Sequence, residues 1–141
     1  GDDQGGLPVP VEGWNEKEVS LSVENKHRQQ WQWMRKTGVV AFGNPRGPST
    51  LHLRAQSPVD FLSGPQTVTV RIGEREIAAF EVEDGTPFLE RIEIPADALG
   101  DGDWIEITLE VSEVFVPAQI DSESTDTREL GLQVFSIYLA R

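Results

Sequence analysis

The chain has 141 residues, with 24 acidic against 12 basic side chains and a formal net charge of −12. A domain of this length buries about 70% of the surface of its unfolded chain, so it can build a core without disulfides or metals. The sequence contains no Cys, which excludes disulfides, a thiolate zinc site and a Cys nucleophile. So acidic a surface repels phosphate backbones and anionic lipid headgroups, and we therefore expect no nucleic-acid partner.

Residues 1–12 are rich in Gly, Asp and Pro, and we interpret them as a flexible leader. The remaining residues, 13–141, suit a single domain. No apolar run approaches the ~20 residues of a membrane span, so we expect no membrane span in this chain. A signal or anchor is not recognisable within the sequence either.

Short segments of alternating apolar and polar residues follow, which is the pattern of half-buried β-strands. Breaker clusters separate them, for example the loop at 43–48 and the hairpin turn at Gly73-Glu74. Thr37-Gly38 permits another turn, and Pro95 begins a stretch that suits one helical turn. In chain order the expected strands centre on residues 19–23, 31–33, 39–42, 51–53, 68–72, 77–82, 92–94, 105–111 and 130–139.

No helix longer than a turn is predicted. About nine strands at this spacing are typical of an all-β fold, an antiparallel β-sandwich.

The last strand changes phase in its middle. Leu130, Leu132 and Val134 share one face, whereas Phe135, Ile137 and Leu139 share a face of the opposite parity. Because a strand alternates sides strictly, an extra residue near Val134 and Phe135 is the simplest cause. We therefore predict a β-bulge there and a central place for this strand in the sheet.

This region also carries a resemblance. The pattern Asp-Xaa-Arg-Xaa-Leu-Gly, here beginning at Asp126, resembles the end of a family of bacterial galactose-binding-like jelly-roll domains. Gly13-Trp14 and the later Arg28 and Trp-rich segment resemble the family's opening, and residues 114–117 resemble its penultimate segment. Such domains occur alone or appended to membrane glycosyltransferases and other cell-envelope sugar enzymes. The resemblance spans about residues 13–139 and implies a jelly roll in an extracytoplasmic (periplasmic or cell-surface) location.

Catalysis has little support in the sequence. His52 lies mid-strand on the polar side, no Ser has a nucleophile-elbow setting, and no carboxylate pair stands out. We predict no catalytic residues, no enzyme activity and no cofactor. Acidic loops at residues 83–84, 101–103 and 121–126 offer hard oxygen ligands, so a structural calcium is an alternative to no metal, although none matches a defined calcium loop.

Tryptophan is the residue type that points to a function. An indole offers a flat apolar face to the C–H face of a sugar ring, and nearby Arg side chains can bind its hydroxyls. We predict an exposed sugar-binding platform of Trp14 and Trp31 with Arg28 and Arg35 beside it, where the 13–17 loop meets the loop before Trp31. The other two indoles, Trp33 and Trp104, are expected to fill the core.

Asp126 and Arg128 are two residues apart and lie on the same side of an extended chain. They could contact a ligand, but we favour an ion pair that pins the loop before the last strand.

The predicted function is a non-catalytic carbohydrate-binding or accessory module of a bacterial cell-envelope polysaccharide system, with a carbohydrate or an envelope protein as partner. The alternative is a protein–protein assembly domain with no sugar site, in which all Trp residues are structural.

Overall fold

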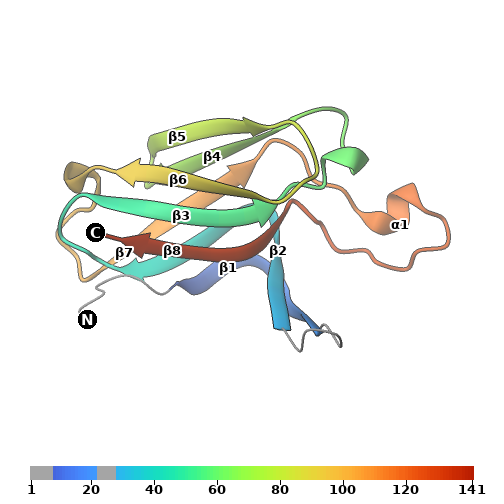
Figure 1. Ribbon diagram of the computed structural model, residues 1–141, viewed down its shortest axis with the longest axis horizontal. Helices are drawn as coiled ribbons and strands as arrows, with labels where there is room; N and C mark the ends of the chain where they lie inside the picture. Colours follow the sequence, from blue (N-terminus) through green and yellow to red (C-terminus); the bar gives the residue numbers. More distant parts are fainter. Residues whose placement is uncertain (1–7, 22–27) are drawn as a thin grey trace.

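The structure is a computed structural model that describes residues 8–21 and 28–141, and within these it describes the side chains of residues 8–15 and 31–141. Strands dominate it, every strand pairing is antiparallel, and the architecture is an all-β jelly-roll sandwich, as predicted (Figure 1). The strands are β1 (Val9–Leu21), β2 (Arg28–Gly43), β3 (Ser49–Gln56), β4 (Gln66–Ile72), β5 (Arg75–Val82), β6 (Phe88–Ile94), β7 (Trp104–Val111) and β8 (Leu132–Ala140). The described residues also form three short helices, η1 (Val59–Phe61), η2 (Ala96–Ala98) and α1 (Pro117–Ile120).

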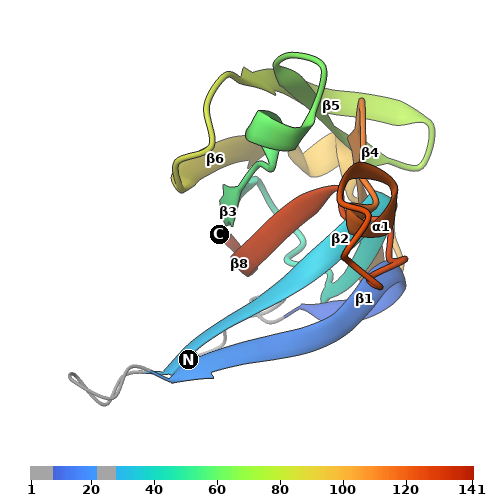
Figure 2. The same cartoon turned by 90° about the vertical axis from the view of Figure 1, so that its right-hand side faces the viewer.

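The two layers of the sandwich meet at β2. Residues 37–43 of β2 pair with β7, which continues to β4 and β5. Residues 32–34 pair with β8, which continues to β3 and β6. Strand β1 pairs with β2 along both stretches, and Figure 2 shows this long hairpin reaching away from the other strands. The hairpin is therefore the element from which both layers start.

Strict alternation of buried residues explains the core. On β7, Ile105, Ile107, Leu109 and Val111 are buried while their neighbours face outward. The same pattern on β3 buries Leu51, Leu53 and Ala55. At the far edges of the two layers, the rings of Phe80 on β5 and Phe88 on β6 form a T-shaped contact, with centroids 5.8 Å apart. This aromatic contact nearly closes the sandwich.

Eight strands are described, rather than about nine, because the predicted strands at 31–33 and 39–42 are one. The expected turn at Thr37-Gly38 does not form, and β2 continues through it. Residues 9–12, which we assigned to the leader, lie in β1 and pair with β2. The turn at Gly73 and the helical turn after Pro95 are both confirmed.

The predicted β-bulge in β8 is confirmed. Opposite β3, Ala55 pairs with Val134 and Arg54 pairs with Ser136, so Phe135 is the extra residue. Leu132 and Val134 are buried before the bulge, and Ile137 and Leu139 are buried after it. Strand β8 is also central, between β2 and β3, as its two apolar parities indicated.

A buried amide ties the two layers together at one end. Gln66 at the start of β4 is 0% exposed. Its Nε2 donates to the carbonyls of Glu113 and Gly131 at 2.9 and 2.6 Å, and its Oε1 accepts from the Ser57 hydroxyl at 2.7 Å. Side chains that link several loops in this way fix where the chain enters β8.

In the part of the chain that the structure describes, no helix is long and apolar enough to cross a membrane.

We expect Gln66→Leu to lower the free energy of unfolding by more than about 2 kcal/mol, because leaving one buried polar group without a partner costs about 1–3 kcal/mol. Urea unfolding followed by circular dichroism measures it. Gln119→Leu is the matched control, since Gln119 is exposed on α1 and surface substitutions usually stay within about 0.5 kcal/mol. Equal destabilisation by the two variants would contradict the structural role of Gln66.

Candidate functional site

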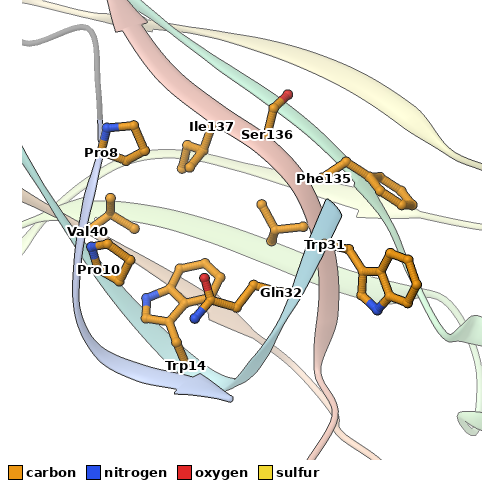
Figure 3. A pocket seen from close by; sticks show the side chains of 10 residues that line it. Pro8, Pro10, Trp14, Trp31, Gln32, Val40, Phe135, Ser136 and Ile137 are labelled. Atoms are coloured by element: carbon orange, nitrogen blue, oxygen red, sulfur yellow. The ribbon is translucent and has the colours of Figure 1, made fainter. Parts of the chain in front are cut away.

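A pocket of about 150 Å³ opens where β1, β2 and β8 meet (Figure 3). Apolar and aromatic side chains form most of its wall, with two polar side chains among them. The residues that line it are Pro8, Pro10, Trp14, Trp31, Gln32, Val40, Val134, Phe135, Ser136 and Ile137. We call it the hairpin pocket, because the β1–β2 hairpin supplies half of its lining.

Trp14 is held rigidly at one side of the hairpin pocket. Its indole Nε1 donates to the Val39 carbonyl at 3.1 Å, and the half-buried ring packs against the hydrophobic core. It lies in β1 and not in a loop, although the pairing of β1 is irregular around it and Gly13 has φ +84°. A Cβ on Gly13 would lie 1.8 Å from the Thr37 carbonyl oxygen, so only glycine fits this crossing. Trp14 is therefore a fixed wall, one part of which faces the pocket.

Trp31 lines the same pocket from β2, but it does not lie beside Trp14. Figure 3 shows Gln32 next to the Trp14 ring, and Trp31 farther along, beside Phe135. Gln32 is oriented by its Nε2, which donates to the Asn15 carbonyl at 2.8 Å. The two indoles thus belong to one pocket without forming a single flat platform.

The two predicted arginines behave differently. Arg28 is the first residue of β2 and pairs with Leu21, and its side chain lies outside the described residues. Arg35 is exposed on β2 and does not line the hairpin pocket.

The core prediction for the other indoles is wrong. Trp104 is 59% exposed, because it precedes Ile105 on β7 and alternation turns it outward. Trp33 is half-buried outside the core and meets the Phe115 ring edge-on, with centroids 6.2 Å apart. Its strand parity points it to the face opposite Met34, which is fully buried.

Eight of the ten lining residues were not predicted to belong to a site, namely Val40, Val134, Phe135 and Ile137, which were expected only in strands, and Gln32, Ser136, Pro8 and Pro10. Gln32 was counted only as the polar side of a strand, and Ser136 lies beside the bulge. Pro8 and Pro10 were placed in the leader, although Val9 and Val11 alternate with the region's prolines and could have indicated a strand.

Acidic groups are dispersed. Among the described residues, no three His, Asp or Glu side chains come close enough to hold a metal ion. In the predicted acidic loops, Asp103 forms an ion pair with Arg46 at 2.7 Å. Asp84 accepts hydrogen bonds from the Thr86 hydroxyl and backbone N–H, and these lower the pKa of Asp84. His52 stacks flat on Tyr138, with ring centroids 4.5 Å apart.

The Asp126–Arg128 ion pair forms as predicted. Arg128 Nη2 donates to Asp126 Oδ2 at 2.7 Å and Nε donates to Oδ1 at 3.0 Å. The Arg128 backbone N–H also donates to Oδ1, and the Asp126 carbonyl accepts from the Ala118 N–H at 2.8 Å. The backbone hydrogen bond joins the loop before β8 to α1, whereas the ion pair itself fixes only the local turn at residues 126–128. These hydrogen bonds, chiefly from the guanidinium, lower the pKa of Asp126 from 3.8 to about 2.

The hairpin pocket has the composition of a binding site for an uncharged, amphipathic ring. Its indoles provide apolar surface, while the Gln32 amide and the Ser136 hydroxyl can exchange hydrogen bonds with a ligand. Among the described residues, the lining contains no carboxylate, Lys or His that could act as an acid or base.

No protein-family model matches the chain, and no curated protein sequence matches it. Solved structures with a similar fold are found. One is BtGH115A, a family GH115 4-O-methyl-α-glucuronidase with specificity for decorated arabinogalactans, at TM-score 0.56 and 10% identity. The match covers 100% of this chain, which spans only 18% of the glucuronidase chain.

Another is the CBM22-1 xylan-binding domain of Paenibacillus barcinonensis Xyn10C, at TM-score 0.50 and 11% identity. This match covers 98% of our chain and 88% of the domain. At such low identity the likeness shows the fold alone, and it agrees with the jelly-roll sandwich.

The Asp126–Arg128 pair predicts a pH dependence. Because the pKa of Asp126 is lower in the folded chain, its ionised form stabilises the fold above about pH 4, and this contribution is lost as the pH falls through about 2. We expect Arg128→Ala to lower the melting temperature at about pH 7, with the difference from the wild type narrowing towards about pH 2. Scanning calorimetry across this range measures it.

Arg75→Ala is the control, since it breaks the Arg75–Asp97 pair, whose side chains are 50% and 77% exposed. A melting difference for Arg128→Ala that is the same at both ends of the pH range would contradict the prediction. Unchanged melting with lost ligand binding would instead assign the pair to a ligand site.

Proposed function

We propose that the protein is a non-catalytic carbohydrate-binding module whose sugar site is the hairpin pocket. One observation carries this proposal. Two indoles from adjacent strands, Trp14 and Trp31, line one small open pocket together with a glutamine amide and a serine hydroxyl. Sugar rings combine flat C–H faces with a rim of hydroxyls, and this pocket offers a complementary surface for both.

The rigidity of the pocket supports the same function. Trp14 is fixed by its hydrogen bond to Val39, and Gln32 is fixed by its hydrogen bond to Asn15. A wall that is already ordered loses little conformational entropy when a ligand binds. The Gln32 Oε1 atom makes no hydrogen bond within the described residues, so it is available to accept one from a sugar hydroxyl.

The fold comparisons are compatible with this function. One similar structure is itself a xylan-binding domain, and the other is a segment of an enzyme that acts on arabinogalactans. A shared fold does not specify a ligand, so xylan and arabinogalactan are only the first ligands to test.

The wider setting is also part of the proposal. The resemblance to galactose-binding-like domains of cell-envelope proteins motivates an extracytoplasmic location and an accessory role beside a polysaccharide enzyme. Its support is the short pattern that begins at Asp126 and the closing strand that follows it.

Binding is expected to be weak and insensitive to salt. An open aromatic site should bind a monosaccharide at about millimolar to high micromolar concentration, which corresponds to ~4–6 kcal/mol. Because none of the described lining residues is charged, added salt screens nothing in the contact.

The direct test is Trp31→Ala, titrated calorimetrically with xylo-oligosaccharides and arabinogalactan oligosaccharides. We expect binding at the hairpin pocket to be lost in a variant that still unfolds cooperatively, with melting followed in parallel. Trp14→Ala should lose binding and also stability, because the Trp14 ring packs against the core and large aromatic deletions in a core cost about 3–5 kcal/mol.

Trp104→Ala is the matched control. It removes an equally large aromatic side chain that is 59% exposed and does not line the hairpin pocket. Unchanged oligosaccharide binding by Trp31→Ala would remove this pocket as the site. Absence of any glycan binding by the wild type would favour the assembly-domain alternative.

A further inference from the structure

A second pocket, of about 170 Å³, lies at the end of the sandwich where η1, the loop after β5 and the segment after β7 come together. Three aromatic side chains contribute to its wall, namely Trp33, Phe61 and Phe115. We call it the end pocket.

The end pocket is separate from the hairpin pocket, although both use β2 and β8. Gln32 pairs with Val134, and both line the hairpin pocket. The next pair, Trp33 with Gln133, lines the end pocket. Since successive residues of a strand point to opposite faces, these two pairs face opposite sides of the β2–β8 ladder.

The aromatic rings form one connected cluster. Phe61 stacks on Phe115 with centroids 4.9 Å apart and 16° between the ring planes. Trp33 meets Phe115 at 80°, so an indole and a phenyl ring line the pocket at nearly a right angle. Phe61 is 57% exposed, so the cluster presents aromatic surface at the mouth of the pocket.

Polar groups are placed among these rings. Gln56 is oriented by its Nε2, which donates to the Gly85 carbonyl at 2.6 Å. The Gln133 amide and the Asp60 carboxylate form no hydrogen bond with the described part of the chain, and both line the pocket. An amide has both donors and acceptors, and a carboxylate can accept from two neighbouring hydroxyls.

We propose that the end pocket is a second carbohydrate site, which holds one sugar ring against the Phe61–Phe115–Trp33 cluster and binds its hydroxyls through Asp60 and Gln133. The inference rests on the proposed function for the class of ligand, but it has its own site. The two amides favour a polyhydroxylated ring over a quaternary ammonium ion, which would use the rings and the carboxylate alone. One protein molecule therefore binds two glycan segments, on opposite sides of the β2–β8 ladder.

The four tryptophans provide a built-in test. Trp14 and Trp31 line the hairpin pocket, Trp33 lines the end pocket, and Trp104 lines neither. The experiment follows the four indole N–H signals by nitrogen–proton correlation NMR during titration with xylohexaose and with an arabinogalactan oligosaccharide. Single Trp→Phe variants assign the signals.

We expect the Trp33 signal to shift with at least one of these oligosaccharides while the Trp104 signal stays still. In Phe61→Ala the dissociation constant reported by Trp33 should rise about fivefold or more, and the response of Trp14 and Trp31 should be kept. Asp60→Asn should weaken the Trp33 response as well, because the amide accepts hydroxyl hydrogen bonds less strongly than the carboxylate.

The other possible outcomes separate the end pocket from the hairpin pocket. Shifts of Trp14 and Trp31 without Trp33 would refute the end pocket and leave the proposed function standing. A Trp33 shift alone would support the end pocket and refute the hairpin pocket as the sugar site. No shift with either oligosaccharide would refute both sites, and a Trp33 shift only with tetramethylammonium chloride would make the end pocket a cation site.

Discussion

The extra residue in β8 is the constraint on which the rest of the structure depends. Before Phe135 the strand buries Leu132 and Val134, and after it the strand buries Ile137 and Leu139. Without the phase change, one of these pairs would face solvent, and the loss would approach the roughly 1.5–3 kcal/mol that each large apolar side chain contributes when buried. The same bulge places residues of both pockets, since Gln133 precedes it and Ser136 follows it. The bulge therefore both completes the core and determines which β8 side chains reach the surface.

Buried amide side chains hold the loops against the strands of the sandwich. Gln66 binds the carbonyls that precede β8, and Asn15 donates to the Glu129 carbonyl at 2.9 Å. Asn44 donates to the carbonyls of Leu99, Gly100 and Gly102 at the other end of the sandwich. Each amide satisfies backbone groups that would otherwise be buried without partners, and in the described residues no buried side-chain polar atom lacks one. Loops fixed by the interior in this way give both pockets walls that are formed before a ligand arrives.

Alternation in the sequence was enough to predict the fold class, the central position of β8 and its bulge, because side-chain parity in a strand is a local property. Local parity also explains the errors. Trp104 was assigned to the core by residue type, whereas its neighbour Ile105 already fixed its outward direction. Contacts between segments that are far apart in the sequence could not be predicted in this way. The contact of Trp33 with Phe115 joins β2 to the segment after β7, and no pattern in either segment encodes it. Hence the sequence predicted two residues of the hairpin pocket, Trp14 and Trp31, and did not predict the end pocket.

The two pockets differ in the charge of their lining residues. The formal net charge of −12 repels acidic glycans at long range, but at physiological salt this repulsion is screened beyond about 8 Å, so local groups decide. At the hairpin pocket no described lining residue is charged, and the Arg54 guanidinium lies 5.2 Å from the centre of the ring of Phe135, which lines that pocket. At the end pocket Asp60 would face a uronic acid carboxylate directly and repel it. If both pockets bind sugars, the end pocket should therefore select neutral rings, whereas the hairpin pocket can accept neutral and acidic rings alike.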